Sequence, residues 1–392
     1  MPHDYTLTKF LRQTPKPLLA EYFSRRGLLP DVDFAALRKT QVEPIIEALE
    51  QLAEDARGTV ESDFQAVFSL ADRAGTQIVV DQAALRGLAI ADEIEAMENH
   101  YHRAMWLLLH HGPPDSDLFE DCVTIARFDD MSFTAARRRK DLPLDVPASD
   151  GDTLAAMADA ISAVYRPQGR GYRCQVEHFL RPNPTRHCFY GYPEDYTTSE
   201  LQFEGPTLSR RLRKSVFEVA LVFRPDEGIL EISAPGAKKD IQALQEVFCR
   251  YALGMDRLPP PTNHRCYELN GLKQRSFAFP TDPADGIAKV EVAALKLHLN
   301  GRPRQRVAVE HDPASGITCH DWMDNVLDQR QVPLRMLDVD QVRIRVEWVP
   351  DDNGKARRPF TFSVGMPDSS SLRDEPHHLL LKRYLTPWKI AP

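Results

Sequence analysis

After about residue 165, the spacing of apolar residues in this chain changes from a helical period to a strand period. In residues 42–52 the apolar positions lie three and four apart, which places them on one face of a helix. In residues 172–180 they alternate instead, with Tyr172, Cys174 and Val176 on one predicted face. A helix period does not suit a strand, so the two halves must fold differently. We therefore predict an α+β fold with a helical N-terminal domain followed by antiparallel β domains.

The first third of the sequence predicts a bundle of amphipathic helices. Each predicted helix carries one apolar stripe, and such stripes need one another for burial. A run of four basic residues and two prolines at 143 and 147 then predicts a linker. The predicted helices cover residues 15–26, 42–52, 64–71, 89–110 as one helix, and 115–128.

The middle of the sequence predicts an antiparallel sheet covered by a helix. Strands are expected at 172–180, 186–191, 197–203, 215–223 and 229–234, between helices at 152–165 and 238–253. The segment 215–223 is apolar on both faces and is expected at the centre of the sheet. Polar residues alternating with the apolar ones in 172–180 predict that one side of the sheet is solvent-exposed. A two-residue turn at Asp226–Glu227 would place residue 231 opposite residue 222.

The last third predicts a second β-rich domain. A proline spacer at 258–261 marks its start, and the alternation in 342–348 and 360–364 predicts a hairpin across a loop that contains Asp352-Asn353-Gly354. The apolar phase changes within 290–299, which predicts a β-bulge near Ala293–Ala294. A terminal helix is expected at 375–385. The predicted domains are residues 1–148, 149–258 and 259–392.

Composition predicts a cytoplasmic protein that does not enter a membrane. No stretch approaches the roughly 18 uncharged apolar residues of a membrane helix. The first residues lack the basic and apolar regions of a secretory signal. Six cysteines are scattered without a Cys-x-x-Cys pair, as is usual in a reducing compartment.

Common catalytic motifs are missing from the sequence. Gly354-Lys355 is followed by alanine, so it does not match a phosphate-binding loop, and no Gly-x-Ser or His-Glu-x-x-His occurs. Gly169-Arg170-Gly171 lacks the third glycine of a dinucleotide fingerprint. We therefore predict no cofactor and favour a non-catalytic protein, while leaving the question of enzyme activity open.

Two groups of residues have side chains that are typical of catalytic or metal-binding sites. Cys174, His178 and His187 or Cys188 could supply zinc ligands, but the same residues suit ordinary core packing, so we predict no metal site. Glu218 and Glu231 could form a carboxylate pair, but the expected register separates them by about 13 Å. Both are then charges on the outer face of a half-exposed sheet.

The window from residue 164 to residue 214 carries the strongest functional signal. It holds eight aromatic and nine basic residues against five acidic ones, in a chain whose net charge is −8. Residues 1–150, by contrast, hold 16 Lys and Arg against 26 Asp and Glu, which disfavours that part for nucleic-acid binding. Arginine beside aromatic rings can bind a protein partner or stack nucleic-acid bases. The predicted binding residues are Arg173, Arg186, Arg210, Arg211, Arg213 and Lys214.

These observations favour a non-catalytic binding or adaptor protein of a cytoplasmic multi-protein assembly. It would contact a protein partner through the basic aromatic surface of the middle domain. An ordinary solvated face explains the same composition, and a nucleic-acid-binding protein is the alternative. Two further alternatives are a metal-dependent hydrolase or nuclease with an unfamiliar site around Glu177, His178, His187 and Asp195, and a regulatory protein that senses a small ligand between domains.

Overall fold

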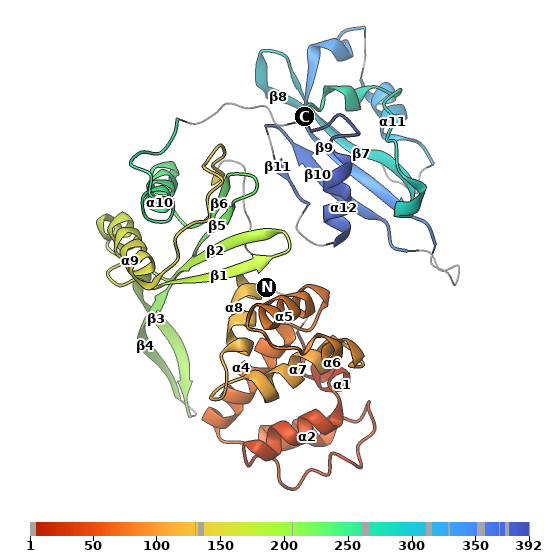
Figure 1. Ribbon diagram of the computed structural model, residues 1–392. Helices are drawn as coiled ribbons and strands as arrows, with labels where there is room; N and C mark the ends of the chain where they lie inside the picture. The colour runs from red at the N-terminus through yellow and green to blue at the C-terminus, as the bar shows by residue number, and fades with distance from the viewer. Residues whose placement is uncertain are drawn as a thin grey trace. The chain divides into compact units, whose positions relative to one another are not determined.

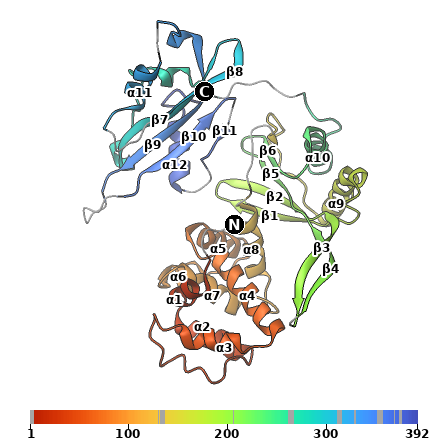
Figure 2. The same ribbon diagram turned by 180° about the vertical axis from the view of Figure 1, so that it is seen from behind.

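The computed structural model shows an α+β protein made of two compact units (Figures 1 and 2). It describes residues 5–129, 131, 137–205, 207–260, 267–310, 316–327, 330–350, 357–367, 369–372 and 376–391. The first unit ends at Pro259 and the second begins at Pro260. The predicted loop at 352–354 and the predicted helix start at Glu375 lie outside the described residues.

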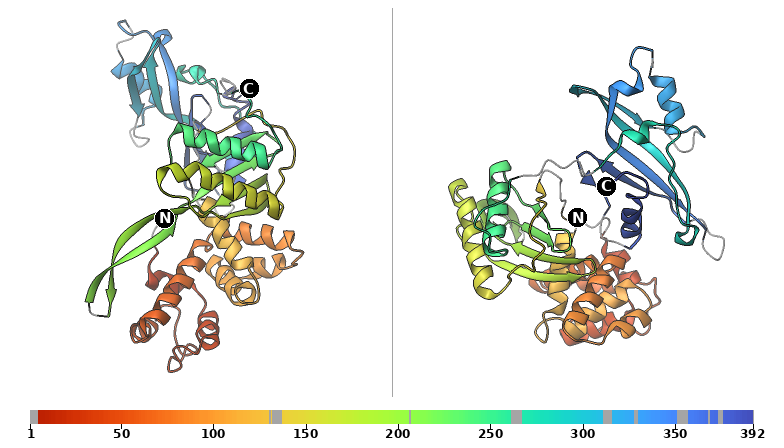
Figure 3. Two further views of the ribbon diagram at one scale, coloured as in Figure 1. Left: turned by 90° about the vertical axis from the view of Figure 1, so that its left-hand side faces the viewer. Right: turned by 45° about the horizontal axis from the view of Figure 1, so that its top comes forward.

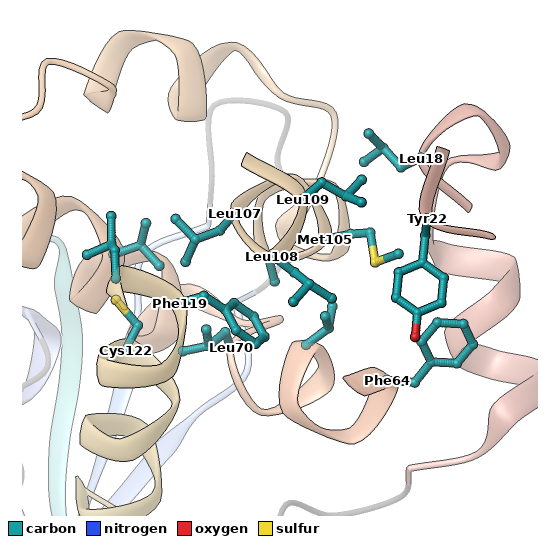
Figure 4. Packing of buried hydrophobic residues seen from close by; sticks show 14 of the residues in the cluster. Leu18, Tyr22, Phe64, Leu70, Met105, Leu107, Leu108, Leu109, Phe119 and Cys122 are labelled. Carbon is teal, nitrogen blue, oxygen red and sulfur yellow. The ribbon is translucent and has the colours of Figure 1, made fainter. Parts of the chain in front are cut away.

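Amphipathic helices form one layer of the first unit. Their apolar faces meet in a core in which Tyr22, Phe64, Met105 and Leu108 point toward one another (Figure 4). This burial explains why short helices of ordinary propensity are stable here, since tertiary packing supplies most helical stability. The helices are α1 (Leu7–Gln13), α2 (Lys16–Arg25), α3 (Glu43–Glu50), α4 (Glu54–Ser69), α5 (Arg73–Leu85), α6 (Ala91–Ala96), α7 (His100–His111) and α8 (Leu118–Asp129).

The prediction of one helix over residues 89–110 is wrong. The chain leaves helix α6 at Met97, whose backbone is extended, and α7 begins after Asn99. The side-chain oxygen of Asn99 accepts a hydrogen bond from the backbone N–H of His102, so this residue caps a new helix. The apolar stripe runs across the break and hid it from the sequence pattern.

A four-stranded antiparallel sheet forms the second layer of the first unit. Its strands lie in the order β1 (Val176–Pro182), β2 (Thr185–Gly191), β5 (Val219–Arg224) and β6 (Ile229–Ser233). Helices α9 (Gly151–Tyr165) and α10 (Lys238–Tyr251) cover one face, as Figure 3 shows. The expected register is confirmed, because Val222 lies opposite Glu231.

The opposite face of this sheet is covered as well, so the prediction of a solvent-exposed side is wrong. Phe179, Cys188 and Tyr190 point into the same core as the helices α1 to α8. The Phe128 ring of α8 stacks on the Tyr190 ring with centroids 3.8 Å apart. The helical layer therefore takes the place of solvent. The division at residue 148 into two separately folding domains stays a prediction. The shared core argues against it, because residues from both sides of position 148 lie in one cluster.

The predicted linker also packs against the sheet. Arg139 forms a β-bridge with Leu230 of strand β6, and the Arg138 guanidinium binds the Glu231 carboxylate at 2.6 Å. Leu142 is buried in the core beneath α9 and α10. The prolines at 143 and 147 therefore follow a segment that is already held on the edge of the sheet.

Two predicted strands in the middle region have different limits in the structure. The strand expected over 172–180 begins only at Val176, and Tyr172 is exposed, not in the core. The strand expected over 215–223 is two strands, because β4 ends at Val216 and β5 starts at Val219. Strands β3 (Glu194–Glu204) and β4 (Thr207–Val216) pair only with each other.

The second unit is a five-stranded antiparallel sheet with helices over its apolar face. Its strands lie in the order β11 (Ser369–Ser370), β10 (Phe360–Gly365), β9 (Leu337–Trp348), β7 (Ile287–Leu299) and β8 (Arg302–Glu310). Helices α11 (Cys319–Val326) and α12 (Pro376–Tyr384) contribute to its core. The predicted hairpin is confirmed by the pair Ile344 and Phe362, and the predicted bulge by a register shift between Val292 and Ala294.

Candidate interaction surface

Strands β3 and β4 form a two-stranded ribbon that projects from the first unit (Figure 3, left). The ribbon continues the two central strands of the sheet. The last pair of β2 and β5 is Gly191 with Val219, and the first pair of β3 and β4 is Glu194 with Val216. Between these pairs, the Phe217 N–H donates to the Pro193 carbonyl at 2.9 Å. Two strands alone are marginally stable in water, so the ribbon depends on its attachment to the sheet.

Arg170 holds the base of the ribbon in place. Its guanidinium lies 4.4 Å from the centroid of the Phe217 ring and 5.4 Å from that of Tyr196, and it approaches Asp195 to 3.6 Å. Such contacts between a cation and aromatic faces stabilise a defined geometry. The Gly171 N–H also donates to the Glu194 carbonyl at 2.7 Å. The base is therefore fixed on the body by side-chain and backbone contacts.

A glycine is required at position 171. Its φ of +75° lies in the left-handed region, and a Cβ atom added there would lie 2.7 Å from the Cβ atom of Tyr165. Any other residue would push the 171–175 segment away from α9. The backbone hydrogen bonds from this segment to the base of β3 explain why the position matters for the ribbon.

The register of the ribbon separates its residues into two unlike faces. Directly opposed residues share a face, and successive residues alternate between faces. Leu201 lies opposite Arg210, and Phe203 lies opposite Leu208. The apolar ribbon face therefore consists of Thr197, Ser199, Leu201, Phe203, Leu208, Arg210, Leu212 and Lys214. The polar ribbon face includes Thr198, Glu200, Gln202, Ser209, Arg211 and Arg213.

The four large side chains of the apolar ribbon face are open to solvent. Leu201 is 56% exposed, Phe203 63%, Leu208 54% and Leu212 80%. Single exposed apolar residues are ordinary on a protein surface, but a contiguous set on one face marks an interaction site. The set lies on the part of the ribbon that extends past the sheet, where the described residues of this chain do not cover it.

Charges are arranged differently on the two ribbon faces. On the polar ribbon face, Arg213 binds Glu200 at 3.2 Å. On the apolar ribbon face, Lys214 binds Glu194 at 2.8 Å, near the base. Hydrogen bonds from Lys214 and then Arg173 lower the pKa of Glu194, so this carboxylate stays ionised. Arg210 is exposed in the middle of the apolar ribbon face, and no carboxylate on the described residues forms an ion pair with it.

The structure distributes the six predicted binding residues over three places. Arg210 and Lys214 lie on the apolar ribbon face, whereas Arg211 and Arg213 lie on the polar ribbon face. Arg173 lies at the base, where its guanidinium binds Glu194 at 2.8 Å. Arg186 lies in strand β2, as its place in the expected strand 186–191 predicts, but its side chain is buried near Asp129 and does not belong to an exposed surface.

The residues considered for a hydrolase or metal site have structural contacts. The rings of His178 and His187 stack, with Nε2 of His178 and Nδ1 of His187 3.1 Å apart. Burial, and then the neighbouring His187, lower the pKa of His178 to about 4. Cys188 points to the other face of the sheet, into the core that it shares with the helices α1 to α8. Glu177 accepts a hydrogen bond from the Tyr192 hydroxyl. Within the described ranges, no three His, Cys, Asp or Glu side chains come together as metal ligands would.

The two carboxylates considered as a pair bind different cations. Glu218 forms an ion pair with Arg127, and Glu231 lies between Arg138 and Arg224 at 2.6 and 3.2 Å. Burial raises the pKa of Glu231, but the two guanidiniums outweigh that effect and leave its pKa below the usual value. Glu231 is therefore an anion that joins the 137–140 segment to strands β5 and β6.

The sequence prediction missed the leucines of the ribbon. It placed residues 210–214 just ahead of the strand expected at 215–223, whereas they lie within strand β4. The alternation of Leu208, Arg210, Leu212 and Lys214 with polar residues was the signal that could have found the strand. In the partner strand β3, Leu201 and Phe203 alternate with polar residues in the same way.

The comparisons with known proteins give no functional information. No protein-family model, curated protein or solved structure matched this chain. Separately, none of the helices in the described part of the chain has the length and hydrophobicity to cross a lipid bilayer.

Proposed function

We propose that this protein is a non-catalytic adaptor of a multi-protein assembly and that the ribbon is its binding arm. The main observation in support of this proposal is the apolar ribbon face, whose four large apolar side chains are more than half exposed. Burial of apolar surface is the main favourable contribution in protein association. Arginine and aromatic side chains are also enriched in the energetic centres of such interfaces. A fixed base and an open face suit a surface that meets a partner without prior rearrangement.

The charge of the ribbon supports a protein partner over nucleic acid. Residues 194–216 contain four acidic and four basic residues, so the ribbon has no net charge. Nucleic-acid binding relies on an excess of cations that neutralise phosphates. The positive excess of the 164–214 window comes partly from Arg181 and Arg186, which are buried in the body of the unit. The basic surface is therefore smaller than the composition of the window suggests.

We also propose that this assembly is cytoplasmic. The five cysteines within the described residues are all free, and four of them are buried. Free thiols of this kind are the usual state in a reducing compartment.

Affinity purification with a ribbon variant tests the adaptor proposal. Wild-type protein and a Phe203→Ser/Leu212→Ser variant would each be immobilised and exposed to extract from cells that express the chain. The matched control is Leu85→Ser/Leu144→Ser, two exposed leucines outside the ribbon. We expect specific proteins to be retained by the wild type and the control, and lost from the ribbon variant. Retention of the same proteins by the ribbon variant would contradict a binding role for the arm.

A further inference from the structure

The apolar side chains of the ribbon form a stripe with the dimensions of a helix contact. Three successive cross-strand rows carry them: Ser199 with Leu212, Leu201 with Arg210, and Phe203 with Leu208. Rows on one face are separated by two residues, which is about 7 Å along a strand. Side chains four residues apart on a helix are separated by about 6 Å. A helix laid along the ribbon would therefore place one anchor on each row.

Other modes of covering this face fit less well. A strand added to an edge of the ribbon would widen the sheet but would leave both of its faces open. A second copy of the chain packed ribbon face to ribbon face would place another Arg210 against this face. Among the eight positions of the apolar ribbon face there is no acidic residue to meet it. Like charges brought together in this way oppose association.

The charge of the stripe indicates the charge of its partner. Lys214 is already paired with Glu194, but the exposed guanidinium of Arg210 in the middle row has no ion pair among the described residues. An interface that surrounds this cation with apolar groups would desolvate it, which is costly unless a carboxylate is supplied. A carboxylate can bind both branches of a guanidinium.

We propose that the apolar ribbon face binds an acidic amphipathic helix of a partner protein. Three apolar side chains of that helix, spaced as i, i+4 and i+7 or i+8, would lie over Leu212, Leu201 and the pair of Phe203 with Leu208. A Glu or Asp beside the central anchor would bind Arg210. This inference rests on the proposed function and specifies the chemistry of the partner.

Two designed peptides test this chemistry on the full-length protein. Both are 18-residue helices with the same leucine stripe, flanked in one by Glu and in the other by Lys. Binding would be measured by fluorescence anisotropy at low and at physiological salt. We expect the Glu-flanked helix to bind about tenfold more tightly than the Lys-flanked helix, and this ratio to fall as salt is raised.

Variants of the ribbon then separate charge from apolar contact. Arg210→Gln should weaken binding of the Glu-flanked helix about threefold, and Arg210→Glu should remove the preference between the peptides. Gln202→Glu makes the same charge change as Arg210→Gln but lies on the polar ribbon face, so it should have little effect. Leu212→Ser should weaken both peptides about tenfold.

The outcomes distinguish this inference from the adaptor proposal. Equal binding of both peptides, or equal effects of Arg210→Gln and Gln202→Glu, would overturn the acidic-helix inference. The adaptor proposal would survive that result if Phe203→Ser/Leu212→Ser still removed proteins retained by the wild type. Concentration-dependent dimers lost in Leu212→Ser would identify a second copy as the occupant, and would also overturn the inference.

Discussion

Replacing Phe128 by alanine tests whether the helices and the sheet of the first unit form one cooperative structure. The Phe128 side chain is 1% exposed, stacks on Tyr190 at 3.8 Å and meets the Tyr192 ring edge-on at 5.8 Å. A Phe-to-Ala change in a core costs about 3–5 kcal/mol, from lost burial and the cavity that remains. This is a large part of the roughly 5–15 kcal/mol that stabilises a typical domain. We expect a correspondingly lower urea midpoint for the first unit.

Hydrogen exchange followed by mass spectrometry shows where that stability is lost. If the core is shared, amides of α5 and α8 and those of β2 and β5 should lose protection together, because residues of all four elements lie in one cluster. The matched control is Phe203→Ala, the same substitution at an exposed ribbon position, which should change stability by less than about 0.5 kcal/mol. Loss of protection confined to the helices, with an unchanged sheet, would refute the shared core and favour a domain boundary at residue 148.

Two further predictions concern buried charges in the first unit. Glu231→Gln should lower the free energy of unfolding of this unit by about 3–5 kcal/mol at neutral pH, because Arg138 and Arg224 would lose their shared anion. Urea unfolding measures this loss, and an unchanged midpoint would contradict the prediction. The pKa of His178 is about 4 in the folded protein, below its usual 6.5, so the folded state resists protonation there. Stability should therefore be retained above pH 6.5 and decrease by about 2 kcal/mol between pH 6.5 and 4. His178→Gln should reduce that decrease, while an equally steep pH profile in the variant would argue against this role.

Local patterns predicted the sheets well where one face of a strand is buried. The pair Val222 with Glu231 follows from alternation and turn length, while alternation alone predicted that 342–348 and 360–364 form a hairpin and that a bulge lies near Ala294. A one-residue error in any of these would turn a buried face toward water, so the pattern specifies the register strongly. The pattern within a strand does not predict which other element will cover the sheet. The second face of β1, β2 and β5 is covered by the helices α1 to α8 from the first third of the chain, and the apolar stripes of these helices do not show which surface they will cover.

The prediction of one helix across Met97–Asn99 was wrong for a related reason. Asn99 is a good N-cap, but a capping residue within a continuing apolar stripe does not by itself require a break. The chain bends there so that Ile94 and Met105 can both reach the core, which is a requirement of packing and not of local propensity.

The ribbon shows that an alternating pattern predicts an apolar strand face but not what covers that face. Leu201, Phe203, Leu208 and Leu212 have the same phase as a buried strand face, yet their side chains are exposed in this chain. Alternation indicates that one face of a strand leaves water, and it does not indicate whether the covering surface belongs to the same polypeptide. In β10 the covering helix α12 lies in the same unit, and the Phe362 side chain is buried. In β3 and β4 the described residues provide no such cover, so the apolar ribbon face remains open to the acidic partner helix that we propose, with Arg210 exposed in its middle row.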